Sequence, residues 1–197
     1  LFIKDLTSGV VTRTEAGELS EGARWASDGR IAFTAGSYVW DPDWAGWWPN
    51  LDLYIADTSG TSVTAATSDH GVLGPPSWAP SGSAIAFSTS TALVASDTNE
   101  VRDVYTTGNP AARVSTTPDG LQSLWESMDP VWSPDGQKVA FIAQDDGPTT
   151  VIVKNLATGT VTQLVDPRKG TVCEEYQDDE VSGERYCAQY TYYEAAR

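Results

Sequence analysis

The feature that most constrains the fold of this chain is an internal repeat with a period of 53 to 54 residues. A repeat of this length indicates that one supersecondary unit recurs along the chain, because a single copy cannot bury its own apolar face. We expect the marker residues of the copies to occupy equivalent positions, each packed between neighbouring sheets. These markers are Trp25, Trp78 and Trp132, followed by Phe33, Phe87 and Phe141.

Each Trp and its Phe enclose a short turn that predicts a β-hairpin. The third copy reads Trp132-Ser-Pro-Asp-Gly-Gln-Lys-Val-Ala-Phe141. Pro fixes φ and Gly accepts a positive φ, so Ser-Pro-Asp-Gly is typical of a tight turn between two strands. In the strand that follows, large residues share one face and the small Ala points to the other. The Ala would let another layer approach closely.

Two further strands complete each copy and predict a four-stranded antiparallel sheet. The third strands are expected at 51–57, 101–107 and 150–155, and the fourth at 62–66, 112–116 and 160–165. No long segment has a 3.6-residue apolar period, which excludes solenoids of helix pairs. The predicted fold class is therefore all-β, with β-propeller blades of four antiparallel strands: three complete repeats plus a partial or closing blade.

These motifs resemble the TolB-like, WD-type β-propeller repeat family. Its pattern is Trp-Ser-Pro-Asp-Gly, then Ile-Ala-Phe, then Asp-Leu-Tyr about one strand later. Segment 132–141 matches the first part, and segments 52–54 and 103–105 match the last. The third copy departs there with Val151-Ile-Val153, and the first has Ala26-Ser27 in place of Ser-Pro. The resemblance covers roughly residues 1–166 and implies a fold; for function it points toward an interaction module.

The repeat divides the chain into five segments. Residues 1–14 correspond to the outer strands of a partial blade, and residues 167–197 to a C-terminal hairpin or partial blade. Either the chain is a piece of a larger propeller, or strands at 171–176 and 185–193 join the N-terminal pair and close a four-bladed ring. The last segment lacks the Trp and the Pro-Asp-Gly turn, which favours the first alternative. The complete blades are expected at 15–67, 68–118 and 119–166.

The charge and the cysteines of the chain limit its possible binding partners and its cellular location. The formal net charge is −15, from 27 acidic and 12 basic residues, a field that repels nucleic acid and anionic lipid. No segment approaches the roughly 20 apolar residues of a membrane span. Cys173 and Cys187 lie in one strand-rich segment, so we expect a disulfide and hence an extracellular or periplasmic protein. Two free thiols in a cytosolic protein are the alternative.

The most unusual segment, 38–50, holds four Trp within nine residues. It falls between the second and third strands of the first copy, so we expect a loop on one face of the propeller. Trp is enriched at the energetic centres of interfaces, which makes this loop the predicted binding surface for a protein or a carbohydrate. The alternative is that the rings are buried locally. The predicted binding residues are Trp40, Trp44, Trp47 and Trp48, with Asp41 and Asp43 beside them.

The sequence predicts no catalytic residue, metal site or cofactor. His70 is the only histidine, so a His-rich zinc site cannot be built and a catalytic triad would have to use it. Neither a Gly-x-Ser-x-Gly elbow nor a phosphate-binding Gly-x-x-x-x-Gly-Lys-Ser/Thr loop occurs. Asp41, Asp43, Asn50 and Asp52 offer oxygen ligands for calcium, but their spacing does not match an EF-hand, and carboxylates commonly cap turns.

The predicted function is a non-catalytic protein-interaction or scaffold propeller that works outside the cytoplasm, because loops on the two faces of a blade suit binding. One alternative is the gating propeller of a prolyl-oligopeptidase-type hydrolase, whose catalytic domain would lie outside these residues. The other is a carbohydrate-binding propeller that uses the Trp segment.

Overall fold

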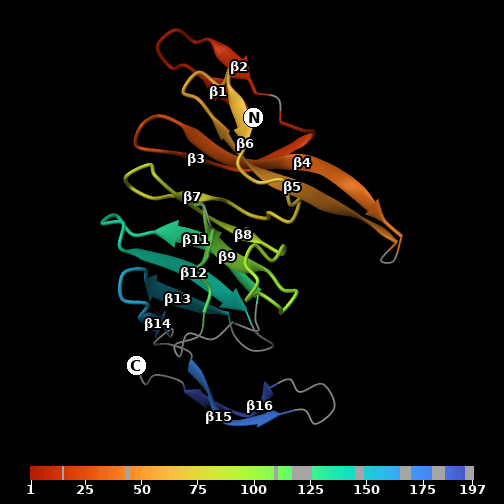
Figure 1. Ribbon diagram of the computed structural model, residues 1–197, viewed down its shortest axis with the longest axis vertical. Coiled ribbons are helices and arrows are strands. Elements are labelled where there is room, and N and C mark those ends of the chain that lie inside the picture. The colour runs from red at the N-terminus through yellow and green to blue at the C-terminus, as the bar shows by residue number, and fades with distance from the viewer. Residues whose placement is uncertain are drawn as a thin grey trace.

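The computed structural model describes residues 1–14, 16–42, 45–108, 111–116, 126–144, 149–164, 170–178 and 185–193, the last two ranges as backbone alone. Every regular element in these ranges is a β-strand, and the strands form five antiparallel sheets arranged along the long axis of the molecule (Figure 1). Three sheets have four strands each, which confirms the predicted fold class. The described residues contain no helix long and apolar enough to cross a membrane.

The four-stranded sheets are meanders in which each strand pairs with the next along the chain. The first contains β3 (Leu19–Trp25), β4 (Ile31–Asp41), β5 (Gly46–Ala56) and β6 (Val63–Ala65). The second contains β7 (Ser77–Trp78), β8 (Ile85–Thr89), β9 (Asp103–Thr106) and β10 (Ala112–Arg113). The third contains β11 (Glu126–Trp132), β12 (Lys138–Gln144), β13 (Thr150–Asn155) and β14 (Val161–Leu164).

The turn after each Trp is closed in the same way in all three sheets, by a hydrogen bond from the N–H of the turn glycine to the carbonyl three residues before it, although the first connection is one residue shorter than the others. Each Trp is the last residue of its strand and pairs with a large apolar residue that begins the next strand or the Val after its start: Ile31, Ile85 and Val139 respectively. The turn glycines all have a positive φ, between 70° and 88°, in the region that side chains rarely adopt. The marker residues therefore occupy equivalent backbone positions. The glycines are Gly29, Gly82 and Gly136.

Where neighbouring sheets meet, the Phe of one sheet is buried in the same cluster as the Ala of the sheet before it. Ala32 of the first sheet and Phe87 of the second belong to one buried cluster. Ala86 of the second sheet and Phe141 of the third belong to the next. Because consecutive residues in a strand face opposite sides, each Ile-Ala-Phe or Val-Ala-Phe segment serves two cores at once. The small Ala leaves the space that the incoming ring fills.

The three repeat Trp side chains do not share one environment, which corrects the prediction for Trp25. Trp78 is 9 % exposed, donates its indole N–H to the carbonyl of Arg24 at 3.1 Å, and lies 4.8 Å from the Arg30 guanidinium. Trp132 is partly buried against the core between the second and third sheets. Trp25 is 61 % exposed, because the sheet that precedes it has two strands instead of four.

Two-stranded sheets lie at the two ends of the molecule (Figure 1). β1 (Phe2–Lys4) pairs with β2 (Val11–Arg13), and β15 (Gly170–Asp178) pairs with β16 (Arg185–Tyr193). The first pair packs Leu1 and Ile3 against the core of the first four-stranded sheet. The two pairs form separate sheets at opposite ends, so the strand exchange that would close a four-bladed ring is not formed in this structure.

The two cysteines lie on the two strands of the C-terminal hairpin, whose side chains fall outside the described residues. The backbone register pairs Cys173 with Tyr190 and Cys187 with Tyr176, so the cysteines are not directly opposite one another. Their disulfide stays a prediction.

Replacing Trp78 with Ala should lower the free energy of unfolding by roughly 3–5 kcal/mol, since a buried indole would be deleted from the core between two sheets. Trp25→Ala removes the same side chain from an equivalent but exposed position and should cost about 1 kcal/mol or less. Urea unfolding of both variants tests this. Equal losses would show that Trp78 is not held by its neighbouring sheets.

Alkylation of the native protein without reductant, followed by mass analysis, should label neither Cys173 nor Cys187. A bond between them would stabilise the fold by about 3 kcal/mol, because it closes a short loop in the unfolded chain. After reduction both thiols should react and the thermal midpoint should fall. Two labelled thiols in the unreduced protein would remove this argument for an extracellular or periplasmic setting.

Candidate functional site

The Trp-rich segment is a β-hairpin, not the loop that the sequence predicted. Strands β4 and β5 stay in register out to the pair Asp41 and Gly46. The pairing of β3 with β4 ends at Gly36, and β6 begins to pair with β5 at Tyr54. Residues 37–41 and 46–50 therefore form a two-stranded extension, here called the aromatic ribbon, which projects from the stack of sheets (Figure 1).

One face of the aromatic ribbon carries a pair of exposed indoles. Trp40 and Trp47 are directly opposite in the register, with ring centroids 5.7 Å apart and ring planes at 70°. This edge-to-face arrangement is a favoured geometry for aromatic pairs. Trp47 is 65 % exposed, and Tyr38 is an exposed neighbour on the same face. The cross-strand pair stabilises this extension of the two strands beyond the rest of the sheet.

The opposite face of the ribbon borders an open pocket of about 360 Å³. Val39 and Trp48 are opposite each other in the register on this face, and Trp48 is 53 % exposed. Asp41 lies on the same face and also lines the pocket. The remaining lining residues are Trp40, Pro42, Pro49, Asn50 and His70.

The structure thus brings four of the six predicted binding residues together on the ribbon: Trp40, Asp41, Trp47 and Trp48. It divides them between two faces, since Trp40 and Trp47 pair on one side and Asp41 and Trp48 face the other. Asp43 and Trp44 lie outside the described residues.

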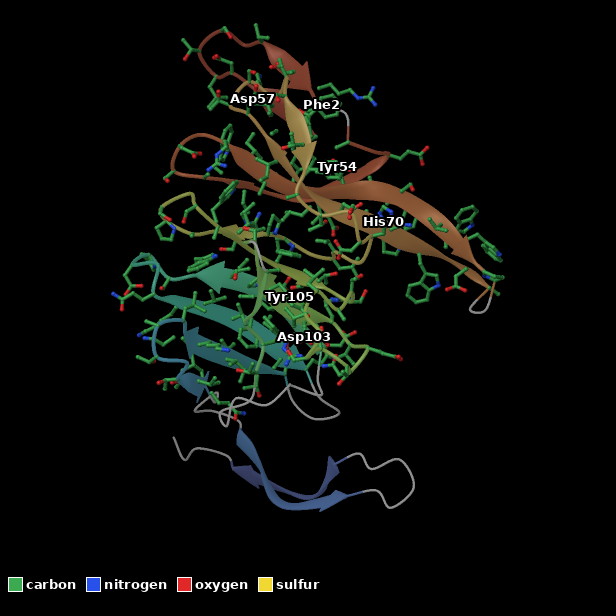
Figure 2. All side chains as sticks on the ribbon, in the orientation of Figure 1. Phe2, Tyr54, Asp57, His70, Asp103 and Tyr105 are labelled. Carbon is green, nitrogen blue, oxygen red and sulfur yellow. The ribbon has the colours of Figure 1, made fainter. Side chains whose placement is uncertain are left out.

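His70 lies at the base of the ribbon and joins the pocket through an interaction that the sequence did not reveal (Figure 2). Its Nδ1 is 2.6 Å from Oδ2 of the buried Asp52, and its backbone N–H donates to Oδ1 at 3.0 Å. These contacts hold His70 at a φ of 62°, a left-handed conformation that is uncommon without glycine. The imidazole itself remains exposed.

Asp52 of the first sheet and Asp103, the equivalent residue of the second sheet, each hold two segments of the chain together. Asp52 accepts the hydroxyl of Thr67, and Thr67 in turn accepts the next backbone N–H of β5 at 2.9 Å. Asp103 accepts the hydroxyl of Ser115, which accepts the next N–H of β9 at 3.0 Å. This carboxylate–hydroxyl clamp ties the third strand to the chain that leaves the fourth. Within the described ranges no group of three or more His, Cys, Asp or Glu could hold a metal ion.

A buried polar cluster in the second sheet was not found by sequence reasoning. Asp97 accepts the phenol of Tyr105, and the Arg113 guanidinium lies 3.6 Å from Asp97 and 3.9 Å from Asp103. Burial raises the pKa of Tyr105, and the hydrogen bond to Asp97 raises it further. Burial also raises the pKa of Asp103, and the nearby Asp97 carboxylate adds to this. Figure 2 shows Asp103 and Tyr105 inside the sheet stack.

The only sequence signal for this cluster was the Asp-Val-Tyr motif at 103–105, because Asp97 and Arg113 come from neighbouring segments that fold onto β9. The cluster fixes segment 90–102 over the second sheet, with Asp97, Asp103 and the Arg113 side chain all largely buried. We therefore interpret it as a structural network.

Asp103→Asn should change how stability depends on pH. A carboxyl whose pKa is raised on folding holds its proton more tightly in the native state than in the unfolded state. Its contribution to the free energy of unfolding is therefore fully present below the unfolded pKa of about 3.9 and is lost as the pH rises through the folded pKa. Between about pH 4 and pH 7, the wild-type free energy of unfolding should fall relative to that of Asp103→Asn. Asn keeps an acceptor for Ser115. Parallel pH profiles of the two proteins would contradict the raised pKa.

Comparisons with known proteins agree with the architecture. No protein-family model matches the chain. The Tol-Pal system protein TolB of Hamiltonella defensa subsp. Acyrthosiphon pisum is 40 % identical over 37 residues, which are 19 % of this chain and 9 % of TolB. The β-propeller domain of the Trilobed protease from Pyrococcus furiosus superposes with a TM-score of 0.51 at 14 % identity, over 78 % of this chain and 44 % of that one.

The acylaminoacyl peptidase of Pyrococcus horikoshii superposes with a TM-score of 0.50 at 15 % identity, over 78 % of this chain and 26 % of the peptidase. The chain thus spans less than half the length of each of these three proteins. At such identities the superpositions show the fold. Together with the repeated Trp-turn-Phe hairpins and four-stranded sheets, they show a β-propeller fold whose repeats are similar to those of TolB.

Proposed function

We propose that the chain is a non-catalytic protein-interaction module that works outside the cytoplasm, with the aromatic ribbon as its main contact surface. The observation that carries this proposal is the exposed pair Trp40 and Trp47 on a ribbon that projects from the sheets. Exposed apolar clusters of this kind commonly mark interaction sites. The similarity to TolB supports an interaction role over catalysis.

The energetics suit a binding surface. A large aromatic side chain buries about 150–250 Å², and each Å² of apolar surface contributes about 25 cal/mol. Covering the exposed parts of Trp40 and Trp47 would contribute on the order of 5 kcal/mol before the costs of association. The ribbon strands continue directly from the buried core, so little ordering is needed on binding.

A second candidate is the propeller of a larger hydrolase, favoured by the similarity to the propellers of the Pyrococcus protease and peptidase. The catalytic domain would then lie outside this chain. In that case the ribbon would contact the hydrolase domain. Cross-linking from the ribbon distinguishes the candidates, because the second requires an α/β-hydrolase as the linked protein.

A photoreactive amino acid in place of Trp47 should cross-link a specific protein partner, whereas the same group in place of Trp25 should not. The two positions are matched, since both indoles are more than half exposed and only Trp47 is on the ribbon. With the linked protein purified, Trp47→Ala should weaken binding by ~30-fold or more, as expected for an interface hot spot worth about 2 kcal/mol. Trp25→Ala should bind like wild type. Equal binding by all three proteins would refute the ribbon as the contact surface.

A further inference from the structure

The outer face of the N-terminal sheet exposes positions that are covered elsewhere in the chain. β1 and β2 are equivalent to β13 and β14, since Lys4 pairs with a Val of β2 as Lys154 pairs with a Val of β14. Phe2 therefore has the position of Ile152, which packs against the core between the second and third sheets. Phe2 itself is 70 % exposed. Inside the chain a face of this kind is covered by the preceding four-stranded sheet.

The outer face of the third sheet is the complementary surface at the other end of the stack. Its Ala140 is equivalent to Ala32 and Ala86, each of which shares a buried cluster with the Phe of the following sheet. Ala140 is only partly buried. Inside the chain a face of this kind is covered by the following sheet. The exposed apolar residues on the same face as Ala140 are Val131, Val151 and Leu164.

The N-terminal sheet also has a strand edge with which no described strand pairs. Thr14 donates its backbone N–H to the carbonyl of Leu1, and Asp5 donates its own to a carbonyl of β2. Because alternate residues of an antiparallel strand turn their backbone groups to the same neighbour, those of Phe2 and Lys4 point away from β2. Such an edge is a template for a further strand.

A groove of about 250 Å³ borders this strand. One side of it is residues 1–4, and the rest of its lining is Ala23, Trp25 and Ile31 of the first sheet. In the four-stranded sheets the third strand has the second strand as its neighbour on this edge, as β13 has β12. The groove thus lies where β1 lacks the two inner strands of a complete sheet.

The C-terminal hairpin has the properties of these two strands. β15 and β16 pair only with each other among the described strands, so together with β1 and β2 they would make four. Their charges are also complementary. Residues 170–193 contain six acidic residues and one basic residue, whereas residues 1–14 contain two basic residues and one acidic residue. Opposite charge favours the approach of the two segments.

The hairpin that can reach β1 is that of a second molecule. The two segments lie at opposite ends of one chain (Figure 1), and the buried clusters between the three sheets hold those ends apart. A head-to-tail contact between copies can close into a ring. Two copies would supply six complete sheets and two composite ones, which is within the ~4–8 blades that propellers contain. Three copies would exceed that range.

We propose that the chain forms a closed head-to-tail dimer. The C-terminal hairpin of each copy pairs along β1 of the other, and the outer face of β1 and β2 packs against the third sheet of that same copy. The contact uses the two ends of the stack and leaves the aromatic ribbon available for a different protein. A photoreactive group at Trp25 would therefore link at most a second copy, whose mass distinguishes it from another protein.

The mass of the full chain in solution is the first test. Size-exclusion chromatography with light scattering, run over a range of protein concentrations, should give the mass of two chains and fall to that of one chain on dilution. The mass of a single chain at every concentration would overturn the proposal. A mass that keeps growing with concentration would overturn it too, because it indicates an open series of copies.

Lys4→Pro tests the strand pairing. Proline removes an N–H from the unpaired edge of β1 and leaves the hydrogen bonds to β2 in place, as edge strands tolerate. It should weaken the dimer at least ~10-fold more than Lys4→Ala, which removes the same side chain but keeps the N–H. Circular dichroism and thermal midpoints of the diluted variants should agree, which separates lost pairing from misfolding. Equal dimerisation of the two variants would refute pairing along β1.

A photoreactive amino acid in place of Phe2 tests which surfaces meet. In a mixture of isotopically labelled and unlabelled chains, it should link to the third sheet of a chain of the other mass. The same group in place of Leu6, which is 90 % exposed in the turn between β1 and β2, is the control and should give no such link. Links from position 2 that join only one chain to itself, or that reach another segment, would overturn the proposal.

Discussion

The packing of the three four-stranded sheets depends on the apolar clusters that join them, in which the Phe of the second and of the third sheet is buried together with the Ala of the sheet before it. Ala32 shares its cluster with Phe87, and Ala86 shares its cluster with Phe141. Protein interiors are packed as tightly as organic crystals, so a larger residue in place of either Ala would force the sheets apart. Because Ala and Phe are neighbours in one strand, the same three residues fix both faces of a sheet. The repeat is therefore a packing requirement as well as a sequence pattern.

The packing between sheets also explains why residues at equivalent positions of the repeat contribute differently to stability. Phe33 is fully buried although only two strands lie against it, since Leu1 and Ile3 reach its side of the sheet. Trp25 occupies the position equivalent to Trp78 but has no Arg partner like Arg30 over its ring among the described contacts. Position in a repeat fixes the backbone of a residue, and the neighbouring sheet decides whether its side chain contributes to stability.

The sequence predicted what each repeat builds locally and missed what separate segments build together. The hairpins at Trp25, Trp78 and Trp132, with their turn glycines, followed from spacing and turn chemistry. The ribbon was expected to be a loop, because it falls between the predicted second and third strands of the first copy. The register of Trp40 with Trp47 depends on β4 and β5 both extending beyond the repeat pattern.

Contacts between separate segments could not be predicted from the sequence either, because they depend on how those segments fold onto one another. Asp97 comes to Tyr105 from a long connection, and His70 comes to Asp52 from the turn between two sheets. Neither pairing has a spacing that a single sequence can reveal. Asp52 was considered as a calcium ligand, whereas the structure uses it, like its counterpart Asp103, to clamp strands through Thr67 and Ser115 respectively.

The connection between the second and third strands is where otherwise similar sheets diverge. In the first sheet it extends the strands outward into an exposed aromatic ribbon; in the second it brings the buried Asp97 to Tyr105 of β9. The core positions around these connections remain equivalent, as Phe33 and Phe87 show by pairing with Tyr54 and Tyr105. Sheets with equivalent cores therefore carry different outer segments. Because the ribbon backbone is paired and continues from buried strands, the proposed binding would cost little backbone entropy.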